Sequence, residues 1–190
     1  MKIYLLSVDS ALTREWKRYF HGCSDVTVVN MAFHTFVGQY EVEGIATPGN
    51  SYGLMDGGYD AAVIDYFGFE LEMEVRRRIK KEWGGEQVVG TSLLVDIPGS
   101  QKKLLHTPSM RVPCPIKDPM VVYHCMRSTL LLAKRRKLKS VVIPAFGGSC
   151  GQLRPKAIAE LMKEAYDQIN NPPEEIDWEY ALRANLESIE

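Results

Sequence analysis

Short apolar runs alternate with segments of helical periodicity along most of this chain. The runs are rich in β-branched residues and end at polar, Gly or Pro residues, which is typical of buried strands. The sequence therefore predicts strands at residues 3–8, 25–31, 44–47, 88–97, 103–107 and 140–146.

Helical spacing fills the segments between these runs. Apolar residues recur every four positions from Leu71 to Trp83, so they share one face of a helix, and Gly84-Gly85 gives that helix a favourable end. The same reasoning predicts helices at residues 13–21, 61–68, 70–83, 118–136, 155–169 and 176–189.

The alternation of strands and helices favours a three-layer α/β/α sandwich around a mixed, largely parallel central sheet. The 190-residue chain has about the length of one domain. Asn171 to Pro173 suits a hinge, so we expect an α/β domain over residues 1–170 and a C-terminal helical extension over residues 171–190. Folds of this class place ligands beyond the carboxyl ends of their strands.

Composition and charge limit the classes of partner and the location that we expect for the protein. A net charge of -1 gives no electrostatic reason to expect nucleic-acid or membrane binding, and the basic runs 76–78 and 134–137 fall on predicted helical faces. No apolar stretch approaches the roughly 20 residues of a membrane span, and the first apolar run is too short for a signal sequence. The four cysteines lack disulfide or metal spacing. We therefore expect a cytoplasmic protein with no metal and no cofactor.

One stretch between a strand and a helix, residues 44–68, reads GIATPGNSYGLMDGGYDAAVIDYFG. Its glycines indicate that the backbone comes close either to the protein's own core or to a ligand. Asn50 can cap the loop backbone or bond a ligand hydroxyl. Asp60 can cap the following helix, or it can present a carboxylate to a ligand or a water molecule. Residues 44–68 leave these alternatives open.

A second glycine-rich loop, residues 146–151 (FGGSCG), joins a predicted buried strand to a helix opened by Pro155. Successive backbone N–H groups in such a loop can converge on one anion. A tight turn without a ligand is the alternative, because no Walker motif is present.

The two loops together resemble the macro domain family, whose members bind ADP-ribose and related nucleotides. Residues 46–63 resemble the family's first loop, and residues 143–151 resemble the strand end and loop that close over the diphosphate. The resemblance covers residues 26–165. It is closest to a bacterial and phage branch that begins with an added strand and helix.

The resemblance also implies roles for individual residues. Asn50 matches the residue that contacts the distal ribose, and Asp60 matches the residue that activates or positions water in the hydrolytic members. The implied ligand-binding residues are Asn30, Thr47, Gly57, Gly58, Tyr59, Phe146, Gly147, Gly148, Ser149, Cys150 and Gly151.

The chain departs from the family where adenine is bound. The family has an Asp after the strand corresponding to residues 25–31, whereas this chain has Asn30 and Met31. Asn30 would then bond the adenine edge. The expected partner is ADP-ribose or an ADP-ribosylated substrate, which the protein would bind and could hydrolyse. The alternative is an interaction module that kept the scaffold and lost the ligand.

Four further residues are weaker candidates. His106 ends a strand near the two loops and could contact the ligand, while His124 falls inside a helix and suits a packing role. Arg111 could contact a phosphate or form a salt bridge. Cys150 could be a reactive thiol or simply a small loop residue.

Overall fold

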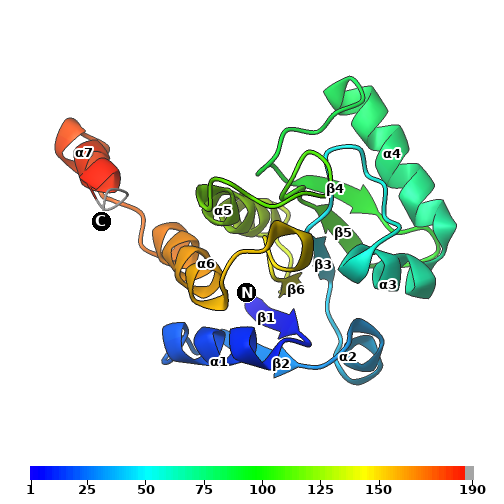
Figure 1. The fold of residues 1–190 in the computed structure, drawn as a ribbon, viewed down its shortest axis with the longest axis horizontal. Coiled ribbons are helices and arrows are strands. Elements are labelled where there is room, and N and C mark those ends of the chain that lie inside the picture. Colours follow the sequence, from blue (N-terminus) through cyan, green and yellow to red (C-terminus); the bar gives the residue numbers. More distant parts are fainter. Residues whose placement is uncertain (187–190) are drawn as a thin grey trace.

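A computed structural model describes residues 1–186, and six strands form its single sheet (Figure 1). The strands are β1 (Lys2–Ser7), β2 (Val26–Asn30), β3 (Gly44–Thr47), β4 (Leu93–Asp96), β5 (Lys103–His106) and β6 (Ser140–Pro144). Their order is β2-β1-β6-β3-β5-β4, and every neighbouring pair is parallel except β4 and β5. The predicted mixed, largely parallel sheet is confirmed.

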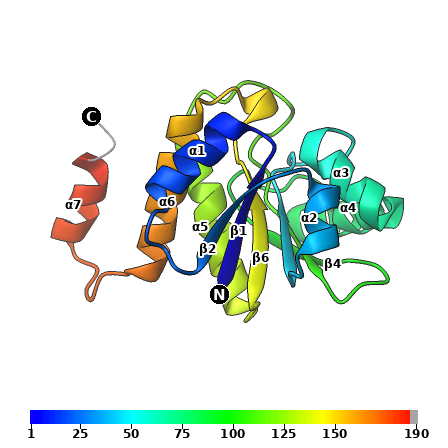
Figure 2. The same ribbon diagram turned by 90° about the horizontal axis from the view of Figure 1, so that it is seen from below.

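Helices cover both faces of the sheet. They are α1 (Ser10–Tyr19), α2 (Phe33–Gln39), α3 (Gly58–Phe67), α4 (Phe69–Trp83), α5 (Met120–Arg135), α6 (Pro155–Asn170) and α7 (Trp178–Leu186), with a short 3-10 helix η1 (Ser149–Gly151). Figure 2 shows α1, α5 and α6 on one side of the strands and α2, α3 and α4 on the other. This arrangement confirms the predicted three-layer sandwich.

The two faces of the sheet build two separate cores, because successive strand residues point to opposite sides. Leu5 and Leu105 belong to the core beneath α1, α5 and α6. Ile45 and Leu104 belong to the core beneath α2, α3 and α4. Thr47 and His106 follow Ile45 and Leu104 by two positions, so both point toward the α3 and α4 side.

Helix α2 was not predicted from the sequence. It has seven residues, its N-cap residue Ala32 makes no side-chain cap bond, and it contains Gly38. Phe33 and Phe36 are buried, and the ring of Phe36 stacks on Tyr40 at 4.9 Å. Packing of these rings therefore stabilises a helix that intrinsic propensity does not indicate.

Strand β4 is shorter than predicted, because residues 88–92 lie outside the strand and include a turn at residues 89–90. Gly90 has a φ of 82°, and the hydroxyl of Thr91 donates to the carbonyl of Val88 at 2.6 Å. Such a local side-chain bond competes with the strand ladder. The turn lies three residues before Leu93, where pairing with β5 begins.

The C-terminal helix α7 stands apart from the sandwich in both views (Figures 1 and 2). Tyr180 accepts a hydrogen bond from the side chain of Gln168 on α6 at 2.5 Å. The predicted helix extended to residue 189, and its residues 187–189 lie outside the described part. The division at residue 170 stays a prediction. No helix within residues 1–186 has the length and apolar character needed to cross a membrane.

Candidate functional site

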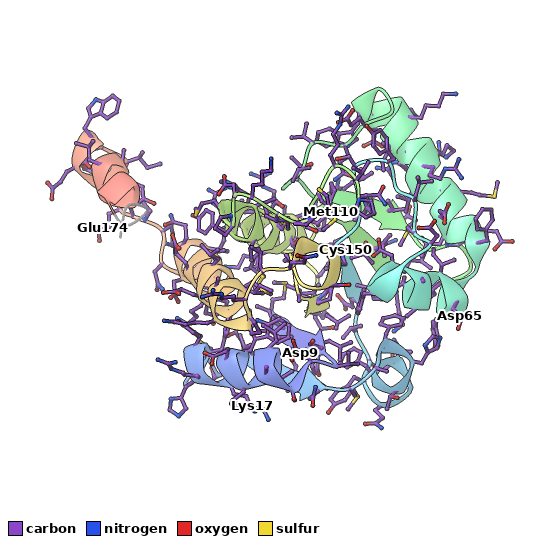
Figure 3. The ribbon with its side chains drawn as sticks, viewed as in Figure 1. Asp9, Lys17, Asp65, Met110, Cys150 and Glu174 are labelled. Carbon is purple, nitrogen blue, oxygen red and sulfur yellow. The ribbon has the colours of Figure 1, made fainter. Side chains whose placement is uncertain are left out.

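A cavity of about 620 Å³ opens at the carboxyl ends of β1, β3 and β6. Segments at or after the ends of five strands line it, namely residues 6–12 in part, 31–33, 48–62 in part, 109–113 in part, and 144–158 in part. Figure 3 labels three of the lining residues, Asp9, Met110 and Cys150, which lie along the middle of the molecule. The volume falls within the range typical of small-molecule sites.

Asn50 lines this cavity, and its carboxamide is bonded to its own loop. The Nδ2 group donates to the carbonyl of Leu54 at 2.7 Å, and Oδ1 accepts from the N–H groups of Tyr52 at 3.1 Å and Leu54 at 3.3 Å. Asn50 therefore shapes the first loop in the structure, and the cap alternative from the sequence is the one observed.

The glycines of the first loop divide into two kinds. A Cβ atom on Gly49 would lie 2.4 Å from Nε2 of His106, and one on Gly53 would lie 2.8 Å from Val75 and Ile79. A Cβ atom on Gly57 would meet nothing within 4 Å, although Gly57 lines the cavity. The core therefore requires glycine at 49 and 53, whereas it has room for a side chain at 57.

Asp60 is the third residue of α3 and lines the cavity, but it does not cap the helix. Its side chain is buried, and Oδ1 has no hydrogen-bond partner among the described residues. Burial raises the pKa of Asp60 from 3.8 to about 7, and the nearby carboxylates of Asp56 and Glu72 add to the rise. Asp60 can therefore exist in either protonation state near neutral pH, which suits a general acid or base.

Tyr59 lies beside Asp60 at the start of α3 and also lines the cavity. Its ring meets Phe33 edge-on at 5.3 Å, and its hydroxyl is buried without a partner among the described residues. Burial and the neighbouring carboxyl of Asp60 raise the pKa of Tyr59 well above its usual value, so Tyr59 is neutral.

The second loop contributes Gly147, Gly148, Ser149 and Cys150 to the opposite wall. Gly147 has a φ of 81°, and a Cβ there would lie 2.7 Å from Leu153. A Cβ on Gly148 would meet only Ala145, at an ordinary 3.6 Å. Ser149 adopts a left-handed φ of 41°. The turn thus requires glycine at position 147. At position 148 a side chain would fit, and its absence exposes the backbone to the cavity.

Four predicted ligand-binding residues are not part of the cavity wall. Asn30 donates to the carbonyl of Ser7 at 2.8 Å and joins β2 to β1. Thr47 is buried within β3, and Phe146 is buried in the core beneath α5 and α6. Gly151 packs against Ile116, where a Cβ would come within 2.9 Å. These four residues therefore do not line the cavity, unlike the other predicted ligand-binding residues.

The weaker candidates also lie outside the wall, apart from Cys150. Arg111 donates to both carboxylate oxygens of Glu86, at 2.6 and 3.0 Å, which is the salt-bridge alternative. His124 is exposed on α5. His106 is completely buried behind Gly49. Cys150 is exposed and lines the cavity.

Sequence reasoning missed Asp9, which lines the cavity at the end of β1. Its Oδ1 accepts from the N–H groups of Ala11 at 2.8 Å and Leu12 at 3.3 Å, so it caps α1. Because β1 pairs with β6, this carboxylate lies at the same sheet edge as the second loop. In the sequence, the available signal for this residue is an Asp at the end of a buried apolar run.

Comparison with known proteins places this geometry in a family. The Macro domain family matches residues 46–162. An uncharacterized protein of Aquifex aeolicus (strain VF5) is 27% identical over 126 residues, which is 66% of this chain and 73% of that protein.

Solved structures show the same fold. The macrodomain of Mycobacterium tuberculosis DarG superposes with a TM-score of 0.59 at 16% identity, covering 69% of this chain and 85% of its own. A substituted Oceanobacillus iheyensis macrodomain, solved with ADPR, gives 0.61 at 20% identity, covering 70% of this chain and 73% of its own. The family match spans more than half of the sequence. This chain belongs to the macro domain family.

Proposed function

We propose that the cavity binds ADP-ribose, free or attached to a substrate, and that Asp60 helps water to cleave the bond to the attached group. The observation that carries this proposal is the pairing of Asp60 with Gly57. Both residues line the cavity: Asp60 carries a buried carboxyl with a pKa of about 7, and Gly57, three residues earlier, has room for a side chain but carries none. Close approach of a ligand explains why the sequence keeps a glycine at position 57, and the neighbouring carboxyl is placed to act on that ligand.

The two loops divide the ligand between them. The flat backbone at Gly148 and the start of η1 suits a diphosphate, since glycine removes the side chain that would hold an anion away from N–H groups. The ribose with the reacting carbon then lies beside Asp60. We assign the adenine to the end lined by Asp9 and Met31, where Oδ2 of Asp9 can accept from the exocyclic amine.

Substituted neighbours support the assignment of the first loop. Three Oceanobacillus iheyensis macrodomain structures carry single replacements of an Asn, of a Gly seven positions later, and of an Asp three positions beyond that Gly. Asn50, Gly57 and Asp60 have the same spacing. The Gly variant was solved with ADPR.

The proposed reaction uses Asp60 as its carboxylate. A water molecule beside Asp60 attacks the anomeric carbon, and its proton passes to the carboxylate as the new C–O bond forms. The bond between that carbon and the substituent breaks, and its electron pair leaves with the substituent. The buried environment favours the protonated product state of Asp60, so proton transfer from water is easier than to an exposed carboxylate.

Binding and hydrolysis are tested separately. Titration calorimetry with free ADP-ribose should give saturable heat, and the ligand should raise the thermal unfolding midpoint. Absence of both at millimolar ligand would exclude an ADP-ribose site. Release of ADP-ribose from an ADP-ribosylated substrate should then be lost in Asp60→Ala. Full turnover in that variant would remove Asp60 from the reaction.

A second candidate is an interaction module without a ligand. The observation in its favour is the apolar surface around α7, where Ile176, Trp178 and Leu182 are all exposed. Deletion of residues 171–190 distinguishes the two proposals, because an ADP-ribose site should keep its affinity while an interaction module should lose its partner.

A further inference from the structure

A buried pair of side chains, Gln87 and His106, lies behind the wall that carries Asp60. Neither residue has any exposed surface. Gln87 sits in the segment after α4, and His106 is the last residue of β5. The Oε1 atom of Gln87 lies 2.8 Å from Nδ1 of His106, so one of the two atoms donates to the other.

The hydrogen-bond partners of Gln87 decide which atom donates. Its Nε2 group donates to the carbonyls of Thr91 at 3.0 Å and His106 at 3.1 Å, so its two N–H bonds are occupied. The atom that faces the imidazole is therefore the amide oxygen, which can only accept. Nδ1 of His106 must carry a hydrogen, and in the neutral ring Nε2 is then an unprotonated acceptor.

This bare Nε2 atom points across Gly49 toward Asp60. A Cβ placed on Gly49 would lie 2.4 Å from Nε2 of His106 and 3.1 Å from Oδ2 of Asp60, so both atoms border one small space. Nε2 and Oδ1 of Asp60 are buried without partners among the described residues, as is the hydroxyl of Thr47, which pairs with His106 across β3 and β5. Three unpaired polar groups on one side of the sheet suit one bound water.

We propose that His106 is a positioning residue for Asp60: one bound water beside Gly49 accepts the proton of the Asp60 carboxyl and donates to Nε2 of His106, and Gln87 holds the imidazole in the tautomer that allows this. The lone pair stabilises the protonated carboxyl and opposes the carboxylate, so it strengthens the base that takes a proton from water. This catalytic consequence rests on the proposed function, whereas the hydrogen-bond arrangement does not.

Two nearby carboxylates raise the pKa of Asp60, the same direction in which the lone pair of His106 acts. Asp56 in the loop and Glu72 on α4 are the carboxylates that face it, and Tyr59 beside it on α3 is neutral. Arg76 forms an ion pair with Glu72 on the same helix at 3.5 Å. Burial keeps the pKa of His106 near 4, so the ring stays neutral while Asp60 titrates. A change at Nε2 near neutral pH therefore reports the proton on Asp60.

Nitrogen NMR of the ligand-free protein tests the arrangement. Long-range ¹H–¹⁵N spectra should show the hydrogen of His106 on Nδ1. Between about pH 5.5 and pH 8.5, the Nε2 resonance should move upfield as Asp60 gains its proton, with a midpoint that follows the Asp60 carboxyl. In Asp60→Ala this pH-dependent movement should vanish. His106→Gln assigns the signals, and the other three histidines serve as internal references.

Gln87→Leu provides a second measurement. Without the amide oxygen, the hydrogen of His106 is no longer kept on Nδ1, so Nε2 can carry it instead. The titration midpoint of the Asp60 carboxyl carbon should then fall by about one pH unit. Two results in the wild-type protein overturn the proposal even if Gln87→Leu fails to fold. One is a hydrogen on Nε2, and the other is an Nε2 resonance whose pH dependence is the same in wild type and in Asp60→Ala. Failure of ADP-ribose to bind would overturn the proposed function and leave these spectra unchanged.

Discussion

The side chain of Asn50 bonds both polar backbone groups of Leu54, donating to its carbonyl at 2.7 Å and accepting from its N–H at 3.3 Å. These hydrogen bonds from Asn50 therefore fix the backbone of the segment that leads to Gly57 and Asp60. Any contact between Asn50 and a ligand would add to this role, so a mutation here affects stability and binding together.

We predict that Asn50→Ala lowers the free energy of unfolding by about 1–3 kcal/mol, because three part-buried hydrogen bonds to the backbone of Tyr52 and Leu54 are lost. Denaturant unfolding monitored by circular dichroism gives the value. Asn30→Ala is the matched control, since Asn30 is exposed and makes one bond to Ser7, and its loss should be under about 1 kcal/mol. Equal losses in the two variants would contradict the role of Asn50.

Asp60 should make the protein less stable as the pH rises. Its pKa is about 7 in the folded protein and near 3.8 in the unfolded chain, so the folded state holds the extra proton between these values. Stability should fall from pH 4 to pH 7 and then level off, with a total cost on the order of 4 kcal/mol. Thermal unfolding across this range should show a flatter profile for Asp60→Asn, which becomes more stable than wild type at pH 8.

Asp65→Asn is the charge-matched control for this profile. Asp65 lies on the same helix α3, but it is exposed and bonds His34 at 3.0 Å. The variant should keep the fall in stability between pH 4 and pH 7. If Asp60→Asn also kept it, Asp60 would not be the group responsible.

Adjacent glycines in the second loop should respond differently to alanine. Gly147→Ala forces a side chain into a φ of 81° and to within 2.7 Å of Leu153, so we predict a loss of more than about 1 kcal/mol. Gly148→Ala has room for its Cβ and should unfold as wild type does. Calorimetry should nevertheless show weaker ADP-ribose binding by Gly148→Ala, because the methyl group stands in the cavity wall.

Gly57→Ala distinguishes an effect on ligand affinity from an effect on the stability of the fold. The φ of Gly57 is -137°, which alanine adopts freely, and no atom lies within 4 Å of the added Cβ. We therefore predict a change in unfolding free energy within about 0.5 kcal/mol. ADP-ribose affinity should fall at least about tenfold, and unchanged affinity would show that no ligand approaches this backbone.

The layers of the fold could be predicted because each strand and most helices carry their own periodicity. Helix α2 could not, since its stability comes from contacts of Phe33 and Phe36 with distant elements. The two kinds of glycine in the first loop also look alike in sequence. Only the fold reveals that His106 fills the space at Gly49 while the space at Gly57 is open.

The chemistry of the site shows the same limit. The positions of Asn50 and Asp60 between a strand and a helix left their roles open, and the resemblance to the macro domain family implied a site role for both; both line the cavity. The pKa of Asp60 could not be anticipated, because it depends on burial and on Glu72 from another helix. Asp9 was missed because local hydrophobic patterns do not reveal the strand order, which places β1 beside β6.

Asp9 provides a test of how the adenine is bound. Serine keeps a capping oxygen for the N–H groups of Ala11 and Leu12, so Asp9→Ser should retain the stability of α1. The carboxylate that faces the cavity is lost, and ADP-ribose affinity should fall about tenfold, the value of one hydrogen bond to a charged group. Ribose 5-phosphate has no base, so its affinity should stay unchanged. Equal weakening of both ligands would indicate that Asp9 acts through the shape of the loop and not through the adenine.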